Sequence, residues 1–209
     1  MAEIGWFVRV ENAAAAFSES GSIANFVDLC GRVLDGYPIL YSDGMVAKIL
    51  SDDLSGNMRK LMAAVSSTDP TASLVTLLAS QRGRLRDSEA VWGALWCART
   101  LEFVAELLRA LGHDAALSIS SAGRATYSKT LSRYHAPVFA WLVSFIVGWA
   151  PTRARVLETS FSGTDNTVVT AACARVAQAL APVTDSVLKL LRDAGADFPD
   201  KQSALPFGL

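Results

Sequence analysis

The chain has 209 residues, a formal net charge of −1 and a hydrophobic content of 51%, and it contains no conspicuous run of Lys or Arg. Binding to a phosphate backbone requires a basic face, so nucleic acid is excluded as a partner. A chain of this length can bury a large core, and no internal repeat or low-complexity linker interrupts it, so we expect one domain over residues 1–209. The hydrophobic content favours an apolar interior, formed either by packed helices or around an apolar ligand.

The three cysteines, Cys30, Cys97 and Cys173, are far apart and form no C-x-x-C pair. This spacing supports neither a zinc site nor a disulfide framework, so we expect buried thiols in a reducing compartment, with no metal or other cofactor. The N-terminus, MAEIGWFVRVENAAAAF, has an acidic third residue and only a short apolar stretch, unlike a secretory signal. The sequence therefore predicts a cytoplasmic protein.

Helical periodicity dominates the chain, and no segment combines β-branched alternation with hairpin turns. We therefore expect an all-α fold of eight or nine helices. The breaks between helices are expected at Gly36 with Pro38, Asp69-Pro70, Gly112, Gly123, Pro151 and Gly163. The helices are expected at about residues 5–18, 22–35, 45–65, 71–82, 87–112, 123–134, 137–149, 151–161 and 165–194.

The first polar cluster lies in SDDLSGNMRKL, residues 51–61. On a helix, Asp53, Asn57 and Lys60 fall within about 60° of one another. They present an acceptor, an amide and an ammonium together, a set that suits a ligand with many hydroxyls. The alternative is that Asp53 caps a helix and the other two are solvated. Gly56 costs a helix roughly 1 kcal/mol, so it marks a place where a ligand or a neighbouring helix is expected to come close.

The second cluster lies in the predicted helix VWGALWCARTLEFVAELLRAL, residues 91–111, where Trp92, Trp96, Arg99 and Phe103 share one stripe. The stripe is either core packing with a cation at its edge or an aromatic platform on which a sugar ring can lie.

His135 is one of only two histidines, and it lies just before an apolar run. It is either a structural residue or, as a neutral imidazole, a hydrogen-bond donor to a buried carbonyl. The run that follows, residues 137–151, has Pro at both ends and is shorter than the ~20 residues that cross a bilayer, so we expect a buried core helix.

Together these segments resemble the glycolipid transfer protein family. The family's Asp-x-x-x-Asn-x-x-Lys helix, with Gly before the Asn, is matched by residues 53–60, and its Leu-Trp-x-x-Arg-x-x-x-Phe helix by residues 95–103. Its Tyr-x-x-x-Leu-x-x-Tyr/Trp-His segment is matched by residues 127–135, and the Ala-Pro helix start that follows by residues 150–151. The three matches occur in the family's order.

The resemblance implies a two-layer α-helical sandwich of about eight helices that takes up one sphingolipid. It also implies that a polar site holds the headgroup and the ceramide amide while apolar side chains enclose the hydrocarbon chains. The headgroup residues so implied are Asp53, Asn57, Lys60, Trp96 and Arg99; the ceramide amide residues are His135 and Asp53; Trp92 and Phe103 are possible additions.

Transfer of such a lipid fits simple energetics. Exposing a 16-carbon chain to water costs roughly 13 kcal/mol, at ~0.8 kcal/mol per CH₂, and an apolar sleeve removes most of that cost. The sleeve cannot distinguish headgroups, so selectivity must come from the polar site. The related group that binds ceramide-1-phosphate has Arg at the position of Trp96 and often one turn earlier, where this chain has Trp92. We therefore favour a glycosylated ceramide.

Three alternatives remain open at this stage. A ceramide-1-phosphate transfer protein would use Lys60 and Arg99, and a sphingolipid sensor would act through a protein partner. An enzyme would have only Asp53, Lys60 and His135 to work with, and the sequence has no nucleophile elbow, P-loop or dinucleotide turn, so we expect none.

Transient contact with a membrane surface is also implied. The family follows its His with Gly-Trp, whereas this chain has Ala136-Pro137, so Trp141, Trp149 and Trp6 are the candidates for that contact. Residues 43–48, which begin with Asp and end with Lys, offer a second start for the polar helix motif, but their spacing is one residue too long and Asp53 is preferred.

Overall fold

The computed structural model describes residues 2–40, 44–65, 72–148 and 150–198. These residues form ten α-helical segments, one short 3₁₀ turn and no strand. The helices are α1 (Ala2–Ser20), α2 (Ile23–Leu34), α3 (Tyr37–Leu40), α4 (Gly44–Val65), α5 (Leu74–Ser80), α6 (Glu89–His113), α7 (Ile119–Lys129), α8 (Pro137–Gly148), α9 (Arg153–Ser160) and α10 (Asn166–Asp193), with the 3₁₀ turn η1 at Leu85–Asp87. The nine expected helices correspond to α1, α2 and α4–α10. The four-residue α3 and η1 were not expected.

The starts of six helices follow from local sequence. In each, a Ser, Thr or Asp side chain accepts a hydrogen bond from a backbone N–H of the first turn, which satisfies a donor that the helix itself leaves unpaired. These N-cap residues are Ser22, Ser73, Ser88, Ser118, Thr152 and Asp165.

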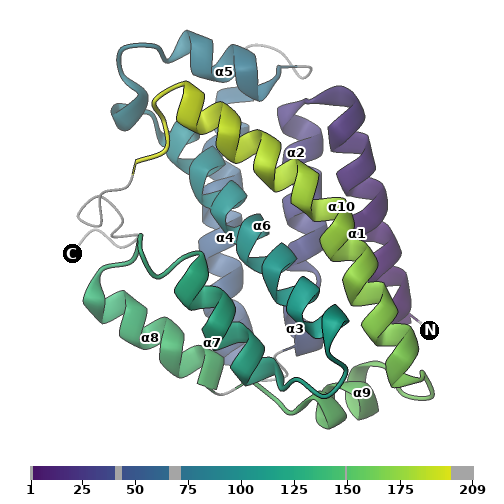
Figure 1. The fold of residues 1–209 in the computed structure, drawn as a ribbon. Helices are drawn as coiled ribbons and strands as arrows, with labels where there is room; N and C mark the ends of the chain where they lie inside the picture. The colour runs from purple at the N-terminus through teal and green to yellow at the C-terminus, as the bar shows by residue number, and fades with distance from the viewer. Residues whose placement is uncertain (1, 41–43, 66–71, 149, 199–209) are drawn as a thin grey trace.

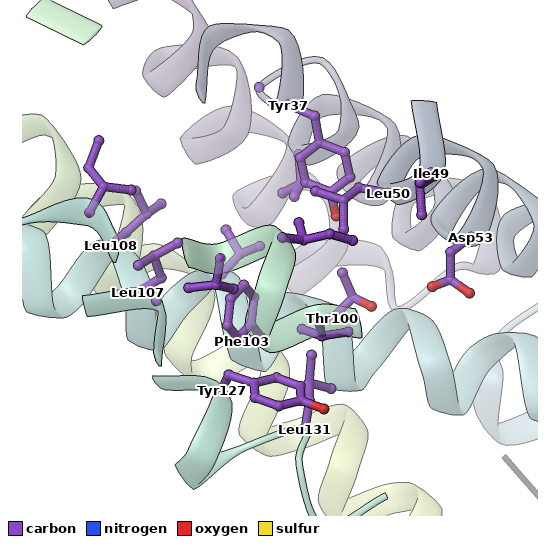
Figure 2. A pocket seen from close by; sticks show the side chains of 18 of the residues that line it. Tyr37, Ile49, Leu50, Asp53, Thr100, Phe103, Leu107, Leu108, Tyr127 and Leu131 are labelled. Atoms are coloured by element: carbon purple, nitrogen blue, oxygen red, sulfur yellow. The ribbon is translucent and has the colours of Figure 1, made fainter. Parts of the chain in front are cut away.

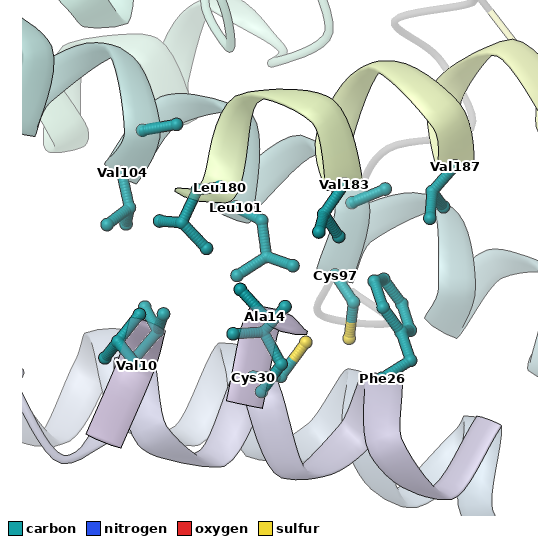
Figure 3. Packing of buried hydrophobic residues seen from close by; sticks show 14 of the residues in the cluster. Val10, Ala14, Phe26, Cys30, Cys97, Leu101, Val104, Leu180, Val183 and Val187 are labelled. Atoms are coloured by element: carbon teal, nitrogen blue, oxygen red, sulfur yellow. The ribbon is translucent and has the colours of Figure 1, made fainter. Parts of the chain in front are cut away.

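The helices form two layers (Figure 1). In one layer α2 lies between α1 and α4, and in the other α6 contacts both α10 and α7, with α8 beyond α7. The layers meet where α4 packs on α6 and α1 packs on α10. Figure 3 shows this interface, with Val10 and Phe26 from the first layer facing Leu101 and Leu180 from the second. The expected two-layer all-α sandwich is confirmed.

The predicted helix break at Gly123 is wrong, and the break predicted at Gly112 falls one residue later, at the end of α6; both glycines allow close packing. Gly112 lies inside α6, where a Cβ would come within 2.5 Å of the Ala174 backbone nitrogen in α10. Gly123 lies inside α7, where a Cβ would meet Val147 of α8 at 2.8 Å. A glycine at a helix crossing and a glycine at a helix end look alike in sequence, since both reflect the missing side chain.

The expectation for Gly56 also needs correction. A Cβ at Gly56 would meet only the Arg59 side chain, at 3.8 Å, so no neighbouring helix comes close there. The close approach between α4 and α6 is at Gly93, whose Cβ would lie 2.5 Å from the backbone oxygen of Asn57. The glycine that allows this contact therefore lies on α6, facing the polar cluster of α4.

Helix α8 is not the buried core helix that the sequence predicted. Of its side chains, Ile146 and Val147 are buried, whereas Val138 is 81% exposed and Trp141 is 68% exposed. The helix contains no charged residue, so its composition suggested burial on all sides. It lies instead at the edge of its layer, with α7 on one side (Figure 1).

Helix α10 is the one helix in the described part of the chain that is long and apolar enough to cross a membrane. Length and composition alone are weak evidence for a span, because the core helix of a two-layer sandwich has the same character. Here α10 packs along α6 on one side and along α1 on another, and Val176, Leu180 and Val183 are buried in those contacts.

Candidate functional site

A cavity of about 130 Å³ lies between the layers. Its wall is mostly apolar and includes residues from α1, α2, α3, α4, α6, α7 and α8. Figure 2 shows Asp53 and Thr100 on the side of the cavity opposite Leu107 and Leu108. The cavity thus offers a polar end and a long apolar interior to the same ligand.

The polar cluster of α4 reaches this cavity through Asp53 alone. Asn57 is buried and its Nδ2 donates to the backbone oxygen of Asp53 at 3.1 Å, while Lys60 is exposed at the surface and lies 3.6 Å from the carboxylate of Glu89. Helix α4 begins at Gly44, so Asp53 is not an N-cap and Asn57 is not solvated. The alternative interpretation of this cluster is therefore wrong for Asp53 and Asn57 and correct for Lys60, which is solvated. The second candidate start includes Asp43, which lies outside the described residues.

Burial raises the pKa of Asp53 above its ordinary value, and the nearby charge of Lys60 acts in the opposite direction. The charged carboxylate loses part of its hydration in the folded protein, and protein groups do not fully replace those interactions. Hydroxyl groups that donate to this carboxylate would restore the missing hydrogen bonds, because a buried acceptor without a partner is costly. Asp53 is accordingly suited to a ligand that brings donors into the cavity.

Trp96 lies at the polar end of the cavity and stacks on His135, with ring centroids 5.3 Å apart and an interplanar angle of 14°. The guanidinium of Arg99 lies 5.1 Å from the centroid of the same indole. The indole is half-buried, so a sugar ring can lie only on the part of it that these neighbours leave exposed.

His135 is buried at the same end of the cavity, and its Nδ1 lies 2.8 Å from the hydroxyl oxygen of Tyr127. Burial, together with the charge of Arg99, lowers the pKa of His135 to about 4, so the imidazole is neutral at pH 7. Burial also raises the pKa of Tyr127 to about 12. A neutral phenol is placed to donate to Nδ1, and an imidazole that accepts on Nδ1 carries its hydrogen on Nε2.

Arg99 is not among the residues that line the cavity. Its side chain is 1% exposed, and Nη2 donates to the Asp197 carboxylate at 2.9 Å and to the Phe198 carbonyl at 2.8 Å. The guanidinium also lies over the Tyr134 ring, 3.4 Å from its centroid. Burial lowers the pKa of Arg99, and the hydrogen bond with Asp197 opposes that effect. This arginine holds the segment after α10 against α6.

Trp92 belongs to the same contact. Its Nε1 donates to the Arg86 carbonyl at 2.7 Å, and its ring lies 5.0 Å from the ring of Phe198. The predicted aromatic stripe of α6 is therefore divided: Trp96 and Phe103 line the cavity, whereas Trp92 and Arg99 pack on the C-terminal segment.

Three polar residues of the cavity, Tyr37, Thr100 and Tyr127, were not predicted as site residues. Thr100 lies one helical turn after Trp96 on α6, and that spacing alone could have identified it. Tyr127 matched the family motif, but its role as the partner of His135 depends on how the chain turns between α7 and α8.

An apolar cavity with polar groups at one end, enclosed by a two-layer helical sandwich, defines a protein that binds an amphipathic ligand with a long hydrocarbon part. The family model described as glycolipid transfer protein matches residues 22–161. The chain belongs to this family.

Relatives with solved structures or curated names are distant in sequence. Glycolipid transfer protein 1 of Arabidopsis thaliana is 26% identical over 176 residues, which cover 82% of this chain and 84% of that protein. The structure is similar to a fungal glycolipid transfer protein, with a TM-score of 0.72 and 21% identity over 86% of this chain and 91% of the other. It is also similar to the human ceramide-1-phosphate transfer protein in complex with ceramide-1-phosphate, with a TM-score of 0.77 and 15% identity over 90% and 97% of the two chains. At these identities the solved structures establish the fold.

Proposed function

We propose that this protein is a single-domain carrier that binds one sphingolipid, a glycosylated ceramide, and transfers it between membranes through the cytosol without chemical change. One observation carries the proposal: the cavity is apolar over most of its wall, is polar at the end formed by Asp53, Trp96 and His135, and has no Lys or Arg among its described lining residues. Hydrocarbon chains fit the apolar part, and a neutral, hydroxyl-rich headgroup fits the polar end.

In this proposal Asp53 accepts hydrogen bonds from sugar hydroxyls or from the ceramide amide N–H, which its desolvated carboxylate favours. His135 donates to the amide carbonyl from Nε2. The exposed part of Trp96 supports the sugar ring. Lys60, which is exposed farther along α4, meets the outer part of the headgroup, and buried Asn57 supports the site through its hydrogen bond to the Asp53 carbonyl.

The positions of the cations favour a sugar over a phosphate. A phosphate headgroup is best held by guanidinium groups that are available for bidentate contact. Arg99 already binds Asp197 and Phe198, and Lys60 lies at the surface beside Glu89. We therefore assign Arg99 and Trp92 a supporting role behind the site rather than contact with the headgroup.

We further propose that α8 makes the transient contact with the membrane. Among the described side chains of this uncharged helix, the large apolar ones that are exposed are Val138, Trp141 and Phe145, and the Trp141 and Phe145 rings stack 5.9 Å apart. The opposite side of α8 lines the cavity, so contact with lipid would occur next to the space that receives it. Of the other two candidates, Trp6 is 6% exposed, and Trp149 lies outside the described residues.

The test of the headgroup site is transfer of a fluorescent glucosylceramide between vesicles. Replacing Asp53 with Val should remove most of the transfer activity, because the ligand's donors would be buried without partners. The matched control is Asp52→Val, since the neighbouring Asp52 is exposed and pairs with Lys48 at the surface. Equal transfer by both variants would refute the assignment of the site.

The same assay with ceramide-1-phosphate separates the two ligand classes. Native mass spectrometry of the protein after incubation with a mixed sphingolipid extract gives the bound class and the stoichiometry directly. Capture of ceramide-1-phosphate in preference to glycosylceramides would overturn the headgroup proposal. Tight binding with negligible transfer would favour the sensor alternative, and separated lipid products would favour an enzyme.

For the membrane contact, Val138→Asp on α8 is compared with Val75→Asp on α5, a helix at the opposite end of the molecule (Figure 1). Val75 is 59% exposed, so both changes add a charge at an exposed apolar position. Vesicle binding should fall for Val138→Asp only, and equal binding by both variants would exclude α8 as the contact.

A further inference from the structure

A second, smaller cavity of about 50 Å³ adjoins the first. Its wall comes from α1, α3, α6, α7, α9 and α10, with the Phe7 and Phe161 rings stacked 5.7 Å apart on one side. Four residues, Trp6, Gly36, Leu108 and Ile119, belong to the walls of both cavities. The two spaces are therefore neighbouring chambers, and Leu108 lies at the end of the first chamber opposite Asp53 (Figure 2).

Trp6 is the largest of the four shared residues, and its position is fixed. Its Nε1 donates to the Arg32 carbonyl at 2.6 Å, and its ring lies against Gly36, where a Cβ would come within 2.4 Å of the indole. Position 36 thus has no room for a side chain while the indole stays in place. Trp6 lies in the wall of both chambers and forms a partition between them, held by the Arg32 carbonyl of α2 and by Gly36.

The second chamber offers nothing to a polar ligand. Arg153 is one of its wall residues, but its guanidinium donates to Asn166, Thr170 and the Leu111 carbonyl, so only its methylene groups face the space. Burial raises the pKa of Cys173, another wall residue, to about 11, which keeps its thiol neutral. A small cavity with such walls stays dry, and apolar atoms that entered it would gain contacts that the walls now lack.

We infer that the second chamber receives the end of the ligand's longer hydrocarbon chain, and that Trp6 determines how much of that chain the protein accommodates. This inference rests on the proposed function, since it takes the polar end of the first chamber as the headgroup site. Along α6, Trp96 is about 18 Å from Leu108, and Leu111 of the second chamber is about 5 Å farther on. A chain that fills the first chamber meets Trp6 at its far end, and a longer chain has the second chamber as its continuation.

The test is the affinity of the protein for glucosylceramides whose acyl chains range from eight to twenty-four carbons. Val169→Phe fills the second chamber, because Val169 is buried in its wall. The matched control is Val168→Phe, since the neighbouring Val168 is 48% exposed on the outside of α10. Trp6→Leu removes the partition and joins the chambers.

Each methylene that loses its place should lower the affinity about fourfold, which corresponds to ~0.8 kcal/mol per CH₂. Val169→Phe should therefore bind short chains like the wild type and lose affinity progressively for long ones, while Val168→Phe keeps the wild-type profile. Trp6→Leu should shift the preference toward longer chains. The same length profile in the wild type and in a folded Val169→Phe would overturn the inference and leave the proposed function intact. Absence of binding at every length in the wild type would instead refute the proposed function.

A measurement on the wild type avoids the question of whether the variants fold. A glucosylceramide with a photoreactive diazirine at the end of a long acyl chain is bound, illuminated and mapped by mass spectrometry. Labels on Val156 of α9 or Val169 of α10 are expected, because both residues line only the second chamber. Labels confined to walls of the first chamber, such as Leu142 or Val143 of α8, would overturn the inference.

Discussion

Helix α6 has two neighbouring faces with different roles, one that lines the cavity and one that packs on the C-terminal segment. On one side, Trp96 and Phe103 line the cavity; on the other, about 40° around the helix axis, Trp92 and Arg99 hold the C-terminal segment. The first side is apolar and hollow, whereas the second is filled by Asp197 and Phe198. Residues of the same types, on one sequence stripe, thus divide into a ligand side and a scaffold side.

A Trp and an Arg on one helix stripe therefore do not by themselves indicate a ligand-binding surface. Whether they can contact a ligand depends on which segment packs on them. Arg99 would be a strong headgroup cation if it were accessible, but its side chain is 1% exposed and its Nη2 already donates to a carboxylate and a carbonyl of the C-terminal segment. Substitutions on the two sides of α6 are distinguished by measuring both the free energy of unfolding and the affinity for the ligand.

The largest effect is expected on the scaffold side. Asp197→Ala leaves the charge of buried Arg99 without its carboxylate, and the free energy of unfolding should fall by about 3 kcal/mol. Urea unfolding measures this change. The control is Asp193→Ala, which breaks an exposed pair with Lys189 and should change the free energy by less than about 0.5 kcal/mol. Similar small losses of stability in both variants would show that the contact between Arg99 and Asp197 does not stabilise the fold.

On the ligand side, Trp96→Leu should lower the affinity for glucosylceramide roughly 30-fold, about 2 kcal/mol, because the sugar loses its aromatic support and His135 loses its stacking partner. Titration calorimetry well below the midpoint of unfolding measures the affinity. An unchanged affinity would show that the indole only fills space.

The pH dependence of stability tests the neutral state of His135. Its pKa is about 4 in the folded protein against an ordinary 6.5. In the unfolded chain the imidazole takes up a proton below about pH 6.5, whereas in the folded protein it stays neutral down to about pH 4. The stability that the neutral His135 contributes is therefore fully present above pH 6.5 and is lost as the pH falls toward 4. Between roughly pH 7 and 5.5 the free energy of unfolding should fall by about 1 kcal/mol.

Asp53 acts in the opposite sense, because its raised pKa favours the folded protein at low pH. Comparison with His135→Gln isolates the contribution of the imidazole. The variant should lack the loss of about 1 kcal/mol, and a wild-type curve parallel to that of the variant would mean that His135 takes up its proton as readily in the folded protein as in the unfolded chain.

The smallest effect is expected for Trp92→Phe. The ring contact with Phe198 is kept, and only the hydrogen bond from Nε1 to the Arg86 carbonyl is lost, so stability should fall by about 1 kcal/mol. The affinity for glucosylceramide should stay within about twofold of the wild type. A loss of affinity as large as that of Trp96→Leu would show that the two sides of α6 are one site.

Much of the helical fold could be predicted, because helix periodicity and N-cap residues are local. Ser88 before α6 and Asp165 before α10 are examples. The errors arose where one signal has two causes. Gly123 predicts a helix boundary but lies inside α7, because a missing side chain permits both a turn and a close crossing, and only the neighbouring helix distinguishes them. The apolar composition of α8 predicts a core helix, although its position at the edge of a layer leaves Trp141 exposed.

The sequence by itself determined the helical class of the protein, the order of its polar motifs and the grouping of Asp53, Asn57 and Lys60 on α4. These follow from spacing along the chain, since residues three and four positions apart share a helix face. Only the tertiary structure decided which of the predicted residues line the cavity. Asp53, Trp96 and His135 come from different segments, and whether a side chain faces a cavity or a neighbouring segment depends on contacts between residues far apart in sequence, such as Arg99 with Asp197.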